Sequence, residues 1–140
     1  MAGCSVKAES LKWPGDSHSA LVPAMVTDIT VEHPGPPARR LVIDTKYYKA
    51  ALVAKQGGAE KLVSAHLYQI YTYLRTQEEH GARFRTASGM LLYPTTGVSL
   101  DEQLLVQGHR IQVATIDLAG DWQGIEERLS SLVESSLDAA

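Results

Sequence analysis

The chain has 140 residues, of which 44% are hydrophobic and 21% are charged, as expected for one globular domain. Its single cysteine, Cys4, excludes an intramolecular disulfide and fits a reducing cytoplasm, and the sequence contains neither a membrane-length apolar run nor a signal peptide. The formal net charge of −3 disfavours a stand-alone nucleic-acid-binding protein, although span 39–61 is rich in lysine and arginine and is either a phosphate-contacting region or a solvated surface.

The first two predicted elements form a hairpin. Residues 1–20 have little pattern beyond a turn at 13–17. Segments 24–31 and 40–46 are rich in β-branched residues, as strands are, and HPGPPA at 33–38 must be a loop because proline cannot donate to a strand ladder. Two strands joined by a short loop most simply pair in antiparallel fashion.

A helix is predicted over 64–80. Ser64 is a suitable N-cap, and Gly81 is a suitable residue just after the helix end. Before this helix, Gly57 and Gly58 indicate a loop at 55–59. The expected apolar stripe of the helix has helical spacing and consists of Leu67, Ile70, Tyr71 and Leu74.

Three further strands follow. Segment 88–93 is apolar and is expected to end at Pro94. Segments 104–107 and 110–118 are predicted to pair around Gly108.

The last predicted element is an amphipathic helix over 122–137, capped by Asp121. Its expected apolar face comprises Trp122, Ile125, Leu129, Leu132 and Val133. The order of strands and helices predicts an α/β domain with a mixed central sheet flanked by helices.

Charged residues end the second strand. Because successive side chains of a strand point to opposite faces of the sheet, Asp44 and Lys46 share one face with Val42. The apolar residues that precede them indicate a sheet covered on both faces. Because buried charges are costly unless they are paired or bound to metal, this strand end is a candidate site. A simple Asp44–Lys46 ion pair is the competing interpretation.

The hairpin adds a second carboxylate. Opposed residues of a bulge-free hairpin have numbers of constant sum, and Pro36 is midway between Asp28 and Asp44. The two aspartates are therefore expected a few ångströms apart on one face. Carboxylates this close require a proton or a cation, and oxygen ligands suit Mg²⁺ or Mn²⁺. Lys46 beside them can stabilise charge on a phosphoryl group.

Polar residues also share one side of the 64–80 helix. His66, Gln69 and Tyr73 lie largely opposite its apolar stripe, where they either reach into a site or form the polar flank of a core helix.

These segments together carry a family resemblance. MVTDITV (25–31), LVIDTKYYK (41–49) and HLYQIYTYL (66–74) resemble the PD-(D/E)xK nuclease superfamily, the last being similar to the Gln-x-x-x-Tyr element of its RecB-like branch. With GMLLYP (89–94), the combination more narrowly resembles the nuclease domain of the McrC family, the cleaving subunits of 5-methylcytosine (McrBC) restriction systems, over about 5–137.

The resemblance implies a restriction-endonuclease-like core that cuts DNA by Mg²⁺-dependent hydrolysis, with Mn²⁺ as a substitute, alongside an AAA+ GTPase subunit of McrB type. It implies metal ligation by Asp28, Asp44 and the backbone carbonyl of Thr45, catalysis by Lys46, and auxiliary roles for Gln69 and Tyr73. Tyr47, Tyr48 and Lys49 match the family run without an assigned role.

Two features depart from the family pattern. Thr27, rather than proline, precedes Asp28. Residues 1–20 resemble neither the partner-binding N-terminal region nor the opening helix of family members, although Glu9 is a candidate substitute for the acid of that helix. We therefore expect a single nuclease domain over 1–140 that is shortened, a fragment, or completed by another chain.

Two other functions fit the same residues. One is a stand-alone RecB-like nuclease that needs no partner. The other is a truncated nuclease-fold protein that binds DNA or a partner without cutting.

Overall fold

A computed structural model describes residues 3–15, 22–46, 52–54, 60–62, 64–95 and 100–138. In chain order its elements are β1 (Ser5–Leu11), β2 (Met25–His33), β3 (Arg39–Thr45), β4 (Leu52–Ala54), β5 (Glu60–Leu62), α1 (Ser64–Arg75), the 3-10 helix η2 (Glu78–His80), α2 (Ala82–Arg85), β6 (Ser88–Thr95), β7 (Asp101–Val106), β8 (His109–Asp117) and α3 (Trp122–Asp138).

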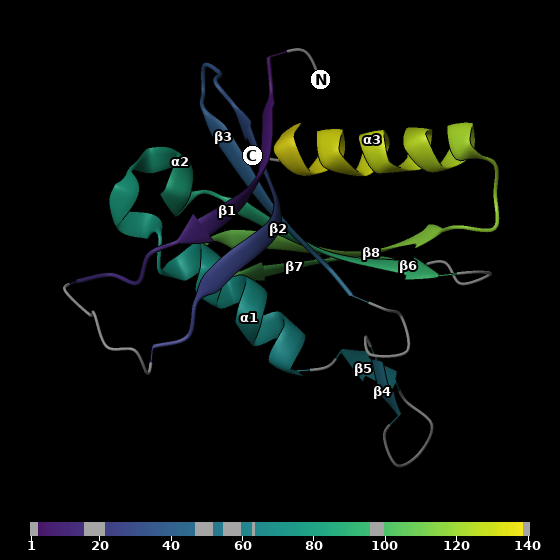
Figure 1. The fold of residues 1–140 in the computed structure, drawn as a ribbon, viewed down its shortest axis with the longest axis horizontal. Coiled ribbons are helices and arrows are strands. Elements are labelled where there is room, and N and C mark those ends of the chain that lie inside the picture. Colours follow the sequence, from purple (N-terminus) through teal and green to yellow (C-terminus); the bar gives the residue numbers. More distant parts are fainter. Residues whose placement is uncertain are drawn as a thin grey trace.

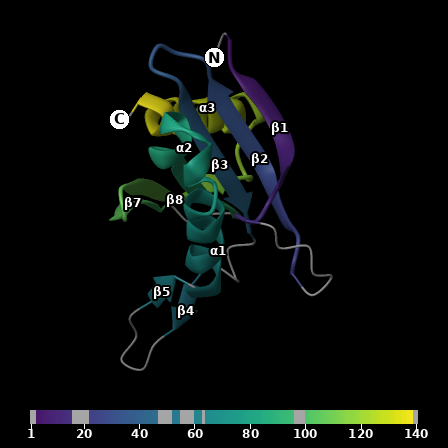
Figure 2. The same cartoon turned by 90° about the vertical axis from the view of Figure 1, so that its left-hand side faces the viewer.

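Six strands form one mixed sheet in the order β1-β2-β3-β6-β8-β7 (Figure 1). The strands β1, β2 and β3 pair in antiparallel fashion, β3-β6-β8 pair in parallel, and β7 returns antiparallel to β8. The short β4–β5 hairpin is a separate sheet near the start of α1 (Figure 2). The predicted α/β class with a mixed sheet is therefore confirmed.

Helices cover both faces of this sheet, as expected (Figure 1). On one face, Ile70 and Leu74 of α1 pack against Val42 and Leu91. On the other face, α3 buries Leu132 among residues that include Leu41, Ile43 and Met90. No helix in the described part of the chain is long and apolar enough to cross a membrane.

Several local predictions are confirmed. The ladder between β2 and β3 includes Ile29 opposite Ile43, as a hairpin centred on Pro36 requires. The β7–β8 turn uses Gln107 and Gly108, with φ of 51° and 85°, as tight hairpins prefer. The Asp121 side chain caps α3 by accepting the Gly124 N–H at 2.8 Å.

The N-terminal strand β1 was not predicted. Most of its side chains are exposed, so SVKAESL lacks the apolar alternation that marks a half-buried strand. Pairing with β2 creates this strand, which forms one edge of the sheet.

The prediction that one helix runs to His80 was wrong, because α1 ends at Arg75. Gln77 is buried and its side-chain amide donates to the Lys12 carbonyl at 2.8 Å. This contact holds the chain against the end of β1. Gly81, with φ of 133°, precedes α2 and is not the residue that ends α1.

The prediction that Pro94 ends its strand was also wrong, because β6 continues to Thr95. Pro94 pairs with Ile116 of β8, while β3 has already ended at Thr45. The Lys46 N–H donates to the Leu92 carbonyl, so the backbone groups of Leu92 point toward β3. Pro94, two residues later, points its nitrogen to the same side, where β3 no longer runs beside β6. A missing N–H is tolerated there.

Trp122 does not pack on the sheet, since it is 77% exposed at the start of α3. The apolar face of this helix is buried toward its other end, at Leu132, Val133 and Leu137. The loop predicted at 55–59 lies outside the described residues, as do Tyr47, Tyr48 and Lys49.

Candidate active site at the end of β3

A β-bulge shapes the strand that carries Asp28. Lys7 of β1 pairs with Thr30 and Glu9 pairs with Thr27, so Ala8 alone lies opposite two residues of β2, Asp28 and Ile29. The β2–β3 ladder correspondingly begins at Ile29 and Ile43. The described β2–β3 ladder is regular, as the sequence prediction assumed, but the bulge on the other side of β2, against β1, was not predicted. Bulges commonly redirect a side chain at a functional site.

Hydroxyl groups support the bulge. Thr27 Oγ1 accepts the Glu9 N–H at 3.0 Å and lies 2.9 Å from Thr30 Oγ1, with both threonines buried. The conformation at Asp28 is thus held by hydrogen bonds that regular strand pairing would not make.

The redirected Asp28 carboxylate binds the end of β3. Its Oδ2 accepts the Thr45 N–H at 2.8 Å and the Thr45 hydroxyl at 3.0 Å. Partial burial alone would raise the pKa of Asp28. The hydrogen bonds from Thr45, a hydrogen bond with Asp44 and the positive charge of Lys46 outweigh this effect, so the pKa is lowered. Asp28 therefore stays ionised at neutral pH.

Asp44 lies deeper, with 3% of its surface exposed. Lys46 Nζ is 3.1 Å from Asp44 Oδ2, yet this contact lacks hydrogen-bond geometry, and the buried Oδ2 has no hydrogen bond. Burial and the neighbouring Asp28 raise the pKa of Asp44 above its ordinary value, against the lowering effect of Lys46. Asp28 and Asp44, hereafter the carboxylate pair, carry more negative charge than one lysine neutralises.

Tyr93 and His66 also lie at this candidate site. The sequence left open whether His66 reaches into a site, and it did not indicate Tyr93. Burial, with the Asp44 charge, raises the pKa of Tyr93 to about 12, so its hydroxyl stays protonated. His66 Nδ1 lies 3.4 Å from that hydroxyl. Burial and the Lys46 charge lower the pKa of His66 and favour the neutral imidazole. Tyr93 comes near Asp44 because β6 pairs in parallel with β3, and the local sequence does not indicate this pairing.

Gln69 and Tyr73 lie on α1, which covers the face of the sheet that carries Val42. The Gln69 amide donates to the Tyr73 hydroxyl at 2.9 Å, and Tyr73 is buried in the core. The two side chains bind each other, and their predicted auxiliary role stays a prediction. The Glu9 carboxylate is bound by Arg40 and Lys7 and makes no described contact with the carboxylate pair.

The residues of the carboxylate pair suit the Mg²⁺ that the resemblance implies. No group of three His, Cys, Asp or Glu residues suited to hold a metal occurs among the described residues. Mg²⁺ commonly uses only one or two carboxylates and completes its shell with water and substrate phosphate. The unsatisfied Asp44 Oδ2 next to Asp28 fits that mode. Thr45 directly follows Asp44, and its N–H donates to the Asp28 carboxylate.

Comparison with known proteins agrees with the motifs. Over 132 residues, 91% of its length, the chain is 31% identical to the type IV methyl-directed restriction enzyme EcoKMcrBC of Escherichia coli K12. The chain is McrC-like. It spans 36% of the length of that relative, so the similarity concerns one part of it. No protein-family model matches the chain.

Proposed function

We propose that this chain is a Mg²⁺-dependent DNA endonuclease domain with a restriction-endonuclease-like PD-(D/E)xK core, acting in a McrBC-type modification-dependent restriction system. The observation that carries the proposal is the strand end where Asp28 and Asp44 meet and Lys46 Nζ lies 3.1 Å from Asp44. The similarity to a restriction enzyme supports a phosphodiester substrate for this acidic site.

Each residue has a role in this proposal. The carboxylate pair and the Thr45 carbonyl hold Mg²⁺, which when bound neutralises phosphate charge and acidifies a water molecule. Lys46, which is 25% exposed, can leave Asp44 and stabilise the negative charge that develops on the scissile phosphate. The Tyr93 hydroxyl, which stays protonated near Asp44, is available as a hydrogen-bond donor at the site. Gln69 and Tyr73 are auxiliary residues.

The proposed partners are DNA and an AAA+ GTPase subunit of McrB type. The choice of these partners rests on the similarity to EcoKMcrBC alone. A cytoplasmic location stays a prediction from the single cysteine.

The decisive test is nicking of supercoiled plasmid with Mg²⁺ or Mn²⁺, with and without a McrB-type partner and GTP. We expect Lys46→Ala to lower the cleavage rate on the order of 100-fold or more, because it removes a charge that acts on the transition state. The control is Lys12→Ala, an exposed lysine with the same change in net charge. Equal cleavage by both variants would overturn the proposal.

The same assay separates the competing functions. Cleavage that needs no partner and is lost in Lys46→Ala would favour a stand-alone RecB-like nuclease. No cleavage under any condition, with no Mg²⁺ binding by calorimetry, would favour a protein that binds DNA or a partner without cutting.

A further inference from the structure

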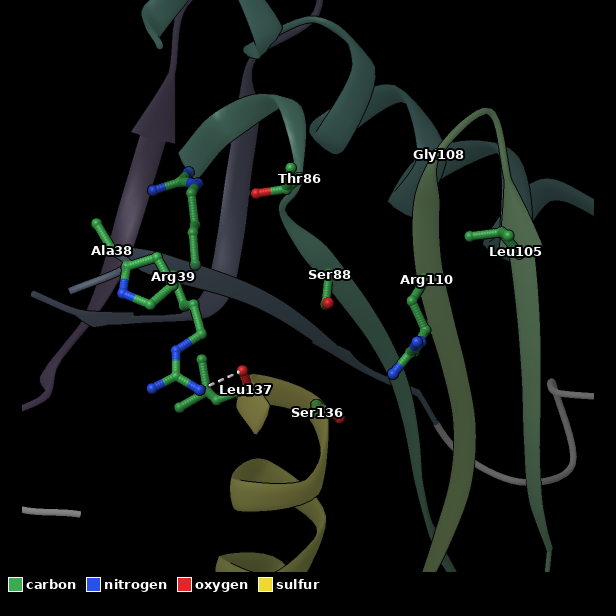
Figure 3. Close-up of a pocket in the computed structure, with 11 residues that line it drawn as sticks. Ala38, Arg39, Thr86, Ser88, Leu105, Gly108, Arg110, Ser136 and Leu137 are labelled. Carbon is green, nitrogen blue, oxygen red and sulfur yellow. Dashed lines mark hydrogen bonds between the residues drawn. The ribbon is translucent and has the colours of Figure 1, made fainter. Parts of the chain in front are cut away.

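A hollow lies at the opposite end of the sheet from the carboxylate pair. It is a cavity of about 360 Å³ between the starts of β3, β6 and β8 and the end of α3 (Figure 3). Arg39 begins β3 and Asp44 lies near the end of that strand, just as Ser88 begins β6 and Tyr93 lies near its end. The cavity is therefore separate from the proposed nuclease site.

Three side chains with N–H or O–H donors converge on this cavity. Ser88 pairs with Leu41 of β3, and the β6–β8 register of Gly89 with Ile111 places Ser88 beside Arg110. Arg39 and Leu41 share the face covered by α3. In Figure 3, Arg39, Ser88 and Arg110 surround one hollow above the last turn of α3.

Much of this donor capacity is unused. Arg39 Nη1 donates to the Leu137 carbonyl and the Asp138 carboxylate, each at 2.9 Å, but Arg39 Nε is buried without a hydrogen bond. Ser88 and Arg110 make no side-chain hydrogen bond or ion pair within the described part of the chain. Ser88 is a largely buried residue, 8% exposed, and its free hydroxyl lines the cavity.

The surroundings favour an anion. None of the described residues that line the cavity is acidic, whereas Arg39, Arg40 and Arg110 line it. Arg40 is already paired with Glu9, which leaves Arg39 and Arg110 as the available cations. The apolar walls, including Ala38 and Leu137, strengthen a charged hydrogen bond inside the hollow.

The direction of the donors selects the kind of anion. A carboxylate is planar and is satisfied by the parallel donors of one guanidinium. Here the donors come from three neighbouring strands, an arrangement that matches the several oxygens of a tetrahedral group. We propose that Arg39, Ser88 and Arg110 bind a phosphate group, with Asp138, which is 75% exposed, moving off Arg39 as the phosphate enters.

The phosphate can belong to a DNA backbone or to a small phosphorylated compound. The proposal does not depend on nuclease activity, so it is tested in EDTA, where failure leaves the nuclease proposal untouched. The first probe is inorganic phosphate at constant ionic strength, with binding measured by calorimetry and thermal melting. Arg110→Gln is the test variant and Arg85→Gln is the control, an exposed arginine that does not line the cavity.

We expect saturable phosphate binding by the wild type and by Arg85→Gln, weakened on the order of tenfold in Arg110→Gln because a charge-assisted contact is lost. Ser88→Ala, which retains the net charge, should weaken binding less but measurably. Absence of saturable binding, or equal affinity in all variants, would overturn the proposal.

A short DNA duplex and a 5′-mononucleotide then identify the source of the phosphate. If the duplex affinity falls in Arg110→Gln but not in Arg85→Gln, the pocket holds the DNA backbone. If only the mononucleotide and inorganic phosphate lose affinity, the pocket takes a small phosphorylated compound.

Discussion

The strand β3 carries buried charge at both ends, but the two ends are balanced differently. At its start, Arg40 is 3% exposed, lies 2.5 Å from Glu9, and has Glu32 as a second acid at 3.5 Å. Arg83 pairs with the same Glu32 at 3.1 Å, and the Arg40 guanidinium lies 4.7 Å above the Phe84 ring. We call these five residues the Arg40 cluster.

The Arg40 cluster contains two cations and two acids, so its charge is matched. At the other end of β3, the carboxylate pair shares one lysine, and the pKa of Asp44 is raised as a result of burial and the neighbouring Asp28. Buried charge alone therefore does not mark a functional site on this strand. The excess of negative charge is what distinguishes the candidate site at the carboxylate pair, because it is satisfied only by a proton or an added cation.

The largest expected effect separates the two ends by stability. Arg40→Met should lower the free energy of unfolding by about 3 kcal/mol, because Glu9 and Glu32 would lose their buried partner and keep only the more exposed Lys7 and Arg83. Lys46→Met should cost less than about 1 kcal/mol, since Lys46 is partly exposed and Asp44 can take up a proton. Urea unfolding at pH 7 measures both. Equal losses would remove the distinction between the ends.

Added metal should act at only one end. Mg²⁺ at about thirty times its dissociation constant should add about 2 kcal/mol to the stability of the wild type, because it binds the folded state. The gain should shrink in Asp28→Asn and remain in Glu32→Gln, a control that changes an acid of the Arg40 cluster. Thermal melts with Mg²⁺ and with EDTA test this, and an equal gain in both variants would contradict a metal site at the carboxylate pair.

The Arg40 cluster should show a pH dependence of its own. Burial alone would raise the pKa of Glu9, but its hydrogen bonds and ion pairs with Arg40 and Lys7 lower it below 4.5. Glu9 therefore contributes stability above pH 4.5, and this contribution is lost as the pH falls through the lowered value. Glu9→Gln should cost about 1 kcal/mol at pH 7 and progressively less at lower pH. A loss that is constant from pH 7 to pH 3 would count against the pairing.

The smallest effect concerns repulsion within the carboxylate pair. In metal-free buffer, Asp28→Asn should raise stability by about 0.5 kcal/mol, because it removes a negative charge while the amide oxygen can still accept from Thr45. The same substitution should abolish cleavage. A clear loss of stability in EDTA would mean that the two aspartates are not in repulsion.

Sequence periodicity was enough to place Asp28, Asp44 and Lys46 together. Alternation along β3 and a hairpin centred on Pro36 are local properties, and the ladder from Ile29 and Ile43 follows them. The bulge was not predictable, because it depends on pairing with β1, whose exposed residues lack a strand pattern.

Features that depend on distant contacts were likewise missed. Thr76 and Gln77 are compatible with a continuing helix, yet α1 ends before them, where the Gln77 side chain binds the distant Lys12 carbonyl. Tyr93 and His66 come to the carboxylate pair through parallel pairing and through the packing of α1, which local spacing does not encode.

The parallel pairing of β3 with β6 has a kinetic consequence. Asp28 and Asp44 belong to a local hairpin, but Asp44 meets Leu91 only after the chain has closed a loop that spans β4, β5, α1 and α2. Contacts across long loops form late in folding, since the loop-closure entropy is lost before the contacts compensate for it. Ile29→Val should therefore slow refolding, whereas Leu91→Ala should mainly accelerate unfolding, as stopped-flow measurements in urea can show. On this route the two carboxylates meet before Tyr93 and His66 enclose them, so the repelling charges are brought together while water still surrounds them.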